Sequence, residues 1–274
     1  MKRHGDDITM QLVASVRRRL AWIAAIPMVS IGLLAGCGGG GGSSSAPSSS
    51  VGSTNTAEGV YQGATSSGWQ FDAIVLENGS LWSIYGTQLN GGLAVTGLFT
   101  GSGSSNNGSY TATTNDFPAP GSTGTPGTLV ANYVTGSTMN GTIQEPNQTV
   151  TFNGSVPVAS TYDYNTSANP SAVSGSWSGK LLDGESATIT VSSSGTISGA
   201  SSGGCAFTGS ITPRPSGKNV YNVTLSFGGS PCFAANASAN GIALLYPISG
   251  GLTQLVAAAV DGNGTAATAF FAQR

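Results

Sequence analysis

The chain carries the same order of short, alternating apolar segments twice, and this internal repeat limits the folds that it can adopt. Residues 59–63 read Gly-Val-Tyr-Gln-Gly, and residues 175–179 read Gly-Ser-Trp-Ser-Gly. Apolar and polar residues alternate in stretches such as 221–227, which is the period of a β-strand. A repeat at a fixed spacing indicates two structurally similar units.

Further strand-like runs follow each motif in the same order. Residues 74–81, 95–99 and 109–112 match residues 189–197, 207–211 and 220–223. Three more runs close each half, near 129–134, 139–144 and 150–156 and near 241–246, 252–260 and 266–272. The pairs Asn78-Gly79 and Asp261-Gly262 lie between runs and favour hairpin turns, because Asn, Asp and Gly tolerate positive φ.

Each half therefore contains about eight short antiparallel strands, the number that closes into a small barrel with a filled interior or a small cavity. Closure also removes the sheet edges that would otherwise aggregate. We predict an all-β chain with two similar eight-stranded barrel-like units at residues 57–158 and 173–274, joined by a linker at 159–172. Two β-sandwiches are the alternative, and one larger sandwich made from both halves is the third possibility.

A separate signal lies ahead of the repeat. Three arginines at 17–19 precede 15 uncharged residues at 20–34, and Leu34-Ala35-Gly36-Cys37 follows. The uncharged stretch has the length of a signal-peptide core and falls short of the roughly 20 apolar residues that span a bilayer. These residues resemble the lipobox of bacterial lipoproteins. The resemblance implies a signal peptide at 1–36, cut before Cys37, and lipid on Cys37; a plain secretory signal is the alternative.

Residues 37–56 follow as a Gly/Ser-rich tether, which behaves as flexible coil. In the lipoprotein resemblance, Gly38 in place of aspartate after the lipidated cysteine implies export to the outer membrane. The expected membrane contact is therefore the lipid anchor, on either the periplasmic or the outer face. Translation starts at Met1 or Met10.

Cleavage at this point would remove much of the chain's chemistry. The sole histidine, His4, would be lost, which excludes Ser-His-Asp triads and His-ligated zinc sites. Four basic residues would remain against nine acidic ones, a net charge of −5, so we expect no binding to nucleic acid. We expect no cofactor, no metal site and no catalytic residue.

Two cysteines remain besides Cys37. Cys205 and Cys232 are expected to form a disulfide, because exported compartments are oxidising. The closed loop would stabilise the chain by about 3.5 kcal/mol in the chain-entropy model. A redox-active or metal-binding pair is disfavoured, because the C-x-x-C spacing and partner ligands are absent.

Several residues could have catalytic or metal-binding roles, but roles in turns and loops explain them better. Residues 199–203 fit G-x-S-x-G, yet the expected strands provide no helix and no histidine for a nucleophile elbow. Asp183 and Glu185 could act as paired carboxylates of a glycoside hydrolase, and Asp261 could bind calcium. Hairpin turns explain all three acids.

Two further sets of side chains are ambiguous from sequence. Asp72 lies in an apolar strand and is expected to face solvent, since burial would require a partner. Four aromatic residues could line a pocket or an interface but are favoured as core residues. They are Trp69, Trp82, Tyr85 and Trp177.

The lipobox, the Gly/Ser tether and the G-x-[WY]-x-G strands with Gly-rich hairpins are together similar to Gram-negative surface lipoproteins of the transferrin-binding-protein and factor-H-binding-protein type. This resemblance implies eight-stranded barrels that bind partner proteins. Our leading hypothesis is a non-catalytic binding or structural module that engages an unknown protein or surface polymer. The alternatives are a lipocalin-like carrier of a small apolar ligand and, third, a carboxylate-dependent hydrolase.

Overall fold

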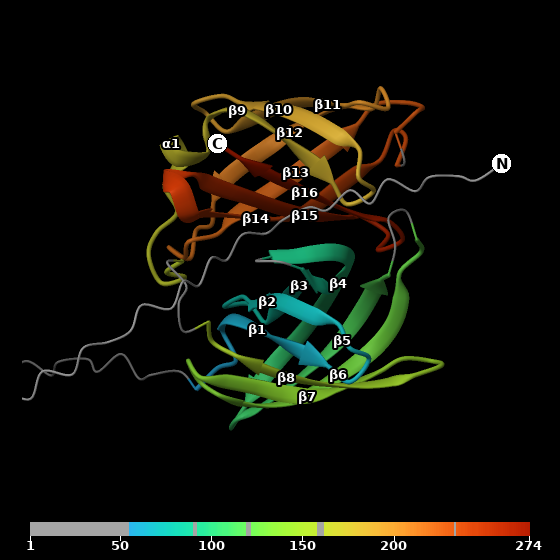
Figure 1. The fold of residues 1–274 in the computed structure, drawn as a ribbon, viewed down its shortest axis with the longest axis vertical. Coiled ribbons are helices and arrows are strands. Elements are labelled where there is room, and N and C mark those ends of the chain that lie inside the picture. The colour runs from blue at the N-terminus through green and yellow to red at the C-terminus, as the bar shows by residue number, and fades with distance from the viewer. Residues whose placement is uncertain (1–54, 90–91, 119–121, 158–161, 233) are drawn as a thin grey trace, which may run out of the picture. The chain divides into compact units, whose positions relative to one another are not determined.

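A computed structural model describes residues 55–89, 92–118, 122–157, 162–232 and 234–274 (Figure 1). Cys37, the signal peptide and almost all of the tether lie outside these residues. Among the described residues, no helix is both long and apolar enough to cross a membrane.

The first half of the described chain is a closed antiparallel barrel in which each strand pairs with the next and β8 pairs with β1. Its strands are β1 (Gly59–Thr65), β2 (Gln70–Val75), β3 (Ser80–Leu89), β4 (Gly92–Asn106), β5 (Ser109–Phe117), β6 (Thr125–Val134), β7 (Thr138–Gln144) and β8 (Thr149–Ser155). The predicted eight-stranded barrel is confirmed for this half.

The second half repeats the same topology, with β16 pairing back to β9 (Figure 1). Its strands are β9 (Gly175–Leu181), β10 (Ser186–Val191), β11 (Thr196–Ser201), β12 (Ala206–Pro213), β13 (Tyr221–Phe227), β14 (Ser238–Pro247), β15 (Thr253–Asp261) and β16 (Ala267–Gln273). A four-residue helix, α1 (Pro170–Val173), precedes β9, and a short 3-10 turn, η1 (Ser249–Gly251), lies between β14 and β15. Both barrels and the internal repeat are thus confirmed, and the sandwich alternatives are wrong.

The aromatic residue of each repeated motif closes one end of its barrel in the same way. The Tyr61 hydroxyl donates a hydrogen bond of 2.8 Å to the Ala57 carbonyl, four residues earlier. The Trp177 indole nitrogen donates a bond of 2.8 Å to the Val173 carbonyl, also four residues earlier. Both rings are almost fully buried, so each polar atom needs such a partner. The segment before the first strand therefore covers this end of each barrel.

The second glycine of each motif allows the barrel to close. A Cβ atom on Gly63 would lie 1.9 Å from the Asn153 carbonyl oxygen of β8. A Cβ atom on Gly179 would lie 2.0 Å from the Phe271 carbonyl oxygen of β16. The first and last strands thus approach closely only because these positions carry no side chain.

Outward-facing apolar side chains of the two barrels share a hydrophobic cluster. Ile84 and Leu98 belong to it from the first barrel, and Val256 and Phe271 from the second. Trp82 packs against the same cluster. Burial of these side chains stabilises contact between the two units of the repeat.

Candidate functional site

The second barrel contains a cavity of about 190 Å³. Its wall is formed mainly by inward-facing aliphatic and aromatic side chains from most of the strands. The lining includes Leu181, Ile189, Ile197, Phe207, Ile211, Val223, Leu225, Phe227, Leu255, Ala257, Ala259 and Phe270. The structure therefore places an apolar chamber inside one of the two repeats.

Small inward-facing residues explain why this chamber exists. Ala257 and Ala259 line it from β15, where larger side chains would extend into the space. On β11, a Cβ atom on Gly199 would lie 2.7 Å from the Phe207 ring and 2.8 Å from Ile189, so glycine leaves room for both. The first barrel instead buries six large aromatic side chains in its core cluster: Tyr61, Phe71, Phe99, Tyr110, Tyr133 and Phe152.

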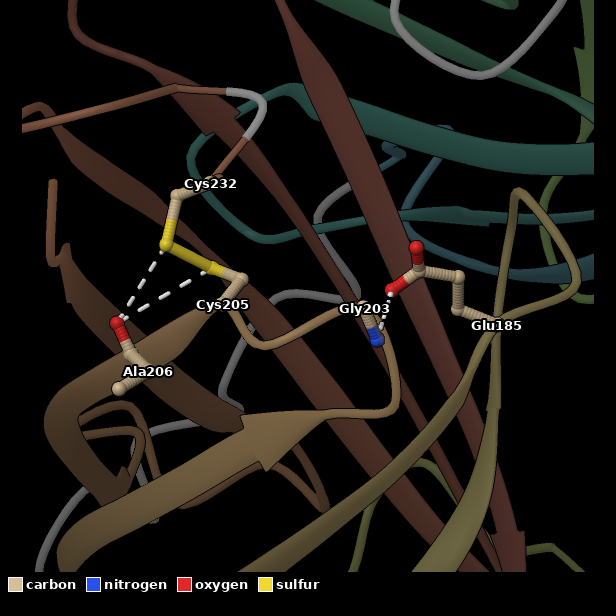
Figure 2. Close-up of a disulfide and its surroundings, with 5 residues drawn as sticks. All are labelled: Glu185, Gly203, Cys205, Ala206 and Cys232. Carbon is tan, nitrogen blue, oxygen red and sulfur yellow. Dashed lines mark hydrogen bonds between the residues drawn. A yellow bond between two sulfur atoms is a disulfide. The ribbon is translucent and has the colours of Figure 1, made fainter. Parts of the chain in front are cut away.

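A disulfide borders the cavity. Cys205 lines it at the turn between β11 and β12, and Cys232 lies in the loop after β13. Figure 2 shows the bond between them. Their Cα atoms lie 4.5 Å apart. The expected disulfide is present, and it ties two loops together beside the cavity.

Two carboxylates from the turn between β9 and β10 lie at the same end. Glu185 and Asp183 both line the cavity. The Gly203 amide donates a hydrogen bond of 3.3 Å to Glu185, which bridges two neighbouring hairpins (Figure 2). Asp183 is exposed and accepts a 2.9 Å bond from the Glu185 amide within the turn. Both acids thus have structural roles in turns, as the sequence predicted.

Ser201 supplies a buried polar group within this apolar wall. Its side chain lines the cavity and is 8% exposed, and within the described part of the chain its hydroxyl oxygen has no hydrogen-bond partner. An unpaired buried hydroxyl is costly unless a ligand or water satisfies it. The G-x-S-x-G segment that contains Ser201 forms a strand and a turn into β12, so it lacks the helix of a nucleophile elbow.

The structure also places two further acids that the sequence singled out. Asp261 accepts hydrogen bonds from the Thr265 amide at 2.6 Å and the Ala266 amide at 2.8 Å, so it organises the predicted hairpin turn. Although burial opposes its ionisation, these bonds hold its pKa below the usual range. Asp72 is exposed on the outward face of β2, as expected, although desolvation of its carboxyl raises its pKa to about 6. Among the described residues there is no cluster of three or more side chains suited to a metal ion.

The prediction that the four aromatic residues are core residues is only partly correct. Trp177 is a core residue, at 1% exposure. Trp82 faces outward and packs against the cluster shared by the barrels. Trp69 is 38% exposed, and its ring centre lies 6.1 Å from that of the partly buried Tyr85. Trp69 and Tyr85 therefore form an aromatic wall at one end of the first barrel.

Beside this wall lies a polar cluster that the sequence did not reveal. The Tyr85 hydroxyl donates a hydrogen bond of 2.7 Å to Asp116 on β5. Burial raises the pKa of Asp116 to about 6; the bond from Tyr85 lowers it, and the nearby charge of Glu145 raises it. Burial, the hydrogen bond to Asp116 and the charges of both acids raise the pKa of Tyr85. The three groups therefore lie close enough to interact electrostatically.

Comparisons with known proteins find a likeness among solved structures. No family model and no curated protein matches the chain. Among solved structures, it is similar to the isotype 1 transferrin binding protein B from serogroup B Neisseria meningitidis, with 9% identity and a TM-score of 0.25 over 75% of this chain. The match spans 65% of that protein's chain. This likeness is too low to support a functional argument, so the case for function depends on the site.

Proposed function

We propose that this chain is a non-catalytic binding module of the bacterial outer envelope, anchored through Cys37, whose second barrel holds a small apolar ligand. The apolar cavity beside the disulfide is the observation that carries this proposal. A binding role with a carrier-type site combines the two leading hypotheses from the sequence. Partner proteins or surface polymers remain candidates for the loops.

The size of the cavity limits the ligand. A buried apolar cavity of about 150 Å³ accommodates a benzene molecule. The cavity here, at about 190 Å³, suits a single aromatic ring or a short alkyl chain of about six carbons. Each buried methylene contributes about 0.8 kcal/mol, so a six-carbon ligand is expected to bind with a Kd on the order of 0.1 to 1 mM.

The polar lining limits the ligand's head group. Asp183 and Glu185 line the cavity, and none of its lining residues is basic. Ser201 offers an unpaired hydroxyl that can donate or accept a hydrogen bond. A neutral alcohol or phenol therefore fits, whereas a carboxylate would be repelled by the two acids and would find no counter-charge.

We expect Ala257→Leu to reduce the affinity for 1-hexanol and toluene by about tenfold or more, because its side chain would occupy the cavity. Isothermal titration calorimetry with the full-length chain in detergent measures this effect. The matched control is Ala200→Leu, on the exposed face of β11, which should bind as the wild type does.

The same titration tests the head group. Hexanoate should bind at least about tenfold more weakly than 1-hexanol, because of the two carboxylates. Equal binding of both ligands would contradict the proposed head-group selectivity. Unchanged affinity in Ala257→Leu would contradict the proposed cavity site.

The anchor has its own test. Cells grown with radiolabelled palmitate should label the wild-type chain and leave the Cys37→Ser variant unlabelled, because the thiol is the point of lipid attachment. Fractionation should then show that the wild-type chain sediments with outer membranes. A labelled Cys37→Ser variant, or an unlabelled wild-type chain, would overturn the lipoprotein assignment.

A further inference from the structure

The first barrel carries acidic side chains with no basic residue of its own. Residues 57–158 contain five acids and no lysine, arginine or histidine. Two of these acids are neutralised from the second barrel: Glu77 pairs with Arg214 at 2.6 Å, and Glu58 pairs with Lys218 at 2.7 Å. A buried carboxylate is costly without a counter-charge, so the remaining inward-facing acids require explanation.

Asp116 and Glu145 are these inward-facing acids. Asp116 follows Tyr110, Ala112 and Thr114 on the interior face of β5, and it accepts the hydrogen bond from Tyr85. Glu145, directly after β7, is 7% exposed and accepts a 2.6 Å bond from the Gln148 side chain. Neither acid forms an ion pair within the described part of the chain.

Thr114 provides a second and independent sign of a missing partner. It is 5% exposed, and its hydroxyl oxygen has no hydrogen-bond partner among the residues that the structure describes. A Cβ atom on Gly127 would lie 3.0 Å from this oxygen and 3.3 Å from Glu145 Cγ. The hydroxyl and the Glu145 side chain therefore lie close together around Gly127, where a side chain would also collide with the Gln144 carbonyl oxygen at 2.8 Å.

The aromatic wall lies at the same end of the barrel. Trp69 directly precedes β2, and Phe71, two residues later, pairs with Tyr85 of β3. Tyr85 in turn contacts Asp116. Aromatic rings attract organic cations, and Trp69, at 38% exposure, is accessible to a ligand.

We propose that this end of the first barrel binds a primary alkylammonium group. The group's three N–H donors match three acceptors, which are Asp116, Glu145 and the unpaired Thr114 hydroxyl. Its positive charge attracts both neighbouring carboxylates and offsets one of their two negative charges, and its alkyl chain extends along Trp69 and Tyr85. The source is a lysine side chain of a partner protein or a free amine.

Calorimetric titration of the full-length chain in detergent with n-butylammonium tests this site. The wild type should bind n-butylammonium and should not bind n-butanol detectably. Asp116→Asn and Glu145→Gln should each weaken binding by about tenfold or more, since each removes a charge while keeping an acceptor oxygen. Thr114→Val should weaken binding by a smaller factor.

Two variants serve as matched controls. Asp72→Asn removes an exposed acid from the outward face of the same barrel, and Asp163→Asn removes an exposed acid from the linker between the barrels. Both should bind n-butylammonium as the wild type does. Near-ultraviolet circular dichroism verifies that each variant is folded. The changes at Asp116 and Glu145 are isosteric, so they remove the repulsion between the two carboxylates without changing the side-chain volume, and we expect both variants to fold.

A lysine-containing peptide and its norleucine analogue distinguish the two sources. Tighter binding of the lysine peptide than of n-butylammonium indicates a protein partner, and binding of n-butylammonium alone indicates a free amine. The proposal is overturned if Asp116→Asn and Glu145→Gln bind n-butylammonium as tightly as the wild type. It is also overturned if propylguanidinium or calcium binds this site and n-butylammonium does not.

Discussion

Replacing Gly179 by alanine is expected to destabilise the second barrel by about 3 kcal/mol or more, because the new methyl group would collide with backbone. The Cβ atom would lie 2.0 Å from the Phe271 carbonyl oxygen, and a backbone atom cannot move aside as a flexible side chain can. The strands β9 and β16 would have to separate where the barrel closes. Urea unfolding of the full-length chain, monitored by near-ultraviolet circular dichroism, measures the decrease in the free energy of unfolding.

The repeat provides a matching test and a control. Gly63→Ala should destabilise the first barrel in the same way, since its Cβ atom would lie 1.9 Å from the Asn153 carbonyl oxygen. Gly262→Ala lies in a turn with open space around it and should change stability by less than about 0.5 kcal/mol. If Gly179→Ala unfolds at the same urea concentration as Gly262→Ala, the close approach of β9 and β16 is wrong.

Removing the disulfide is the second change with a large expected effect. Cys205 and Cys232 are 27 residues apart, and a cross-link over that distance stabilises a fold by about 3.5 kcal/mol through the unfolded chain. The double variant Cys205→Ser with Cys232→Ser should therefore unfold at a clearly lower urea concentration. It should also bind 1-hexanol more weakly, because the two loops beside the cavity are no longer joined.

Reductant provides the control for this variant. Dithiothreitol should lower the stability of the wild type towards that of the double variant and should leave the double variant unchanged. Equal stability of the oxidised wild type and the double variant would show that the cross-link does not hold the second barrel together.

Much of the fold could be predicted from the sequence, because alternation of apolar residues and the spacing of hairpin turns are local properties. The repeated motifs at Gly59 and Gly175 predicted where each barrel begins. The burial of Trp177 could also be predicted, since a large aromatic residue at the head of a strand in a small barrel is usually buried. The role of Gly179 was not, because the clash with Phe271 depends on the pairing of strands far apart in the chain.

The two candidate sites could not be predicted from the sequence for the same reason. The cavity is lined by Ala257 and Ile197, which are distant in sequence and face the same interior. Asp116 and Glu145 come together only when β5 to β7 curve into a barrel. One signal was present in the sequence, namely that residues 57–158 hold five acids and no basic residue. That imbalance indicates unpaired carboxylates without showing which of them face inward.

The most direct test of the ligand-binding cavity is a crystal structure of the chain exposed to bromobenzene. Anomalous scattering from bromine locates the ligand without reference to the protein's own density. We expect one strong bromine peak inside the second barrel, between Ile197, Val223 and Phe270. Bromine found only on the outer surface, with side chains filling the interior of the second barrel, would contradict this expectation.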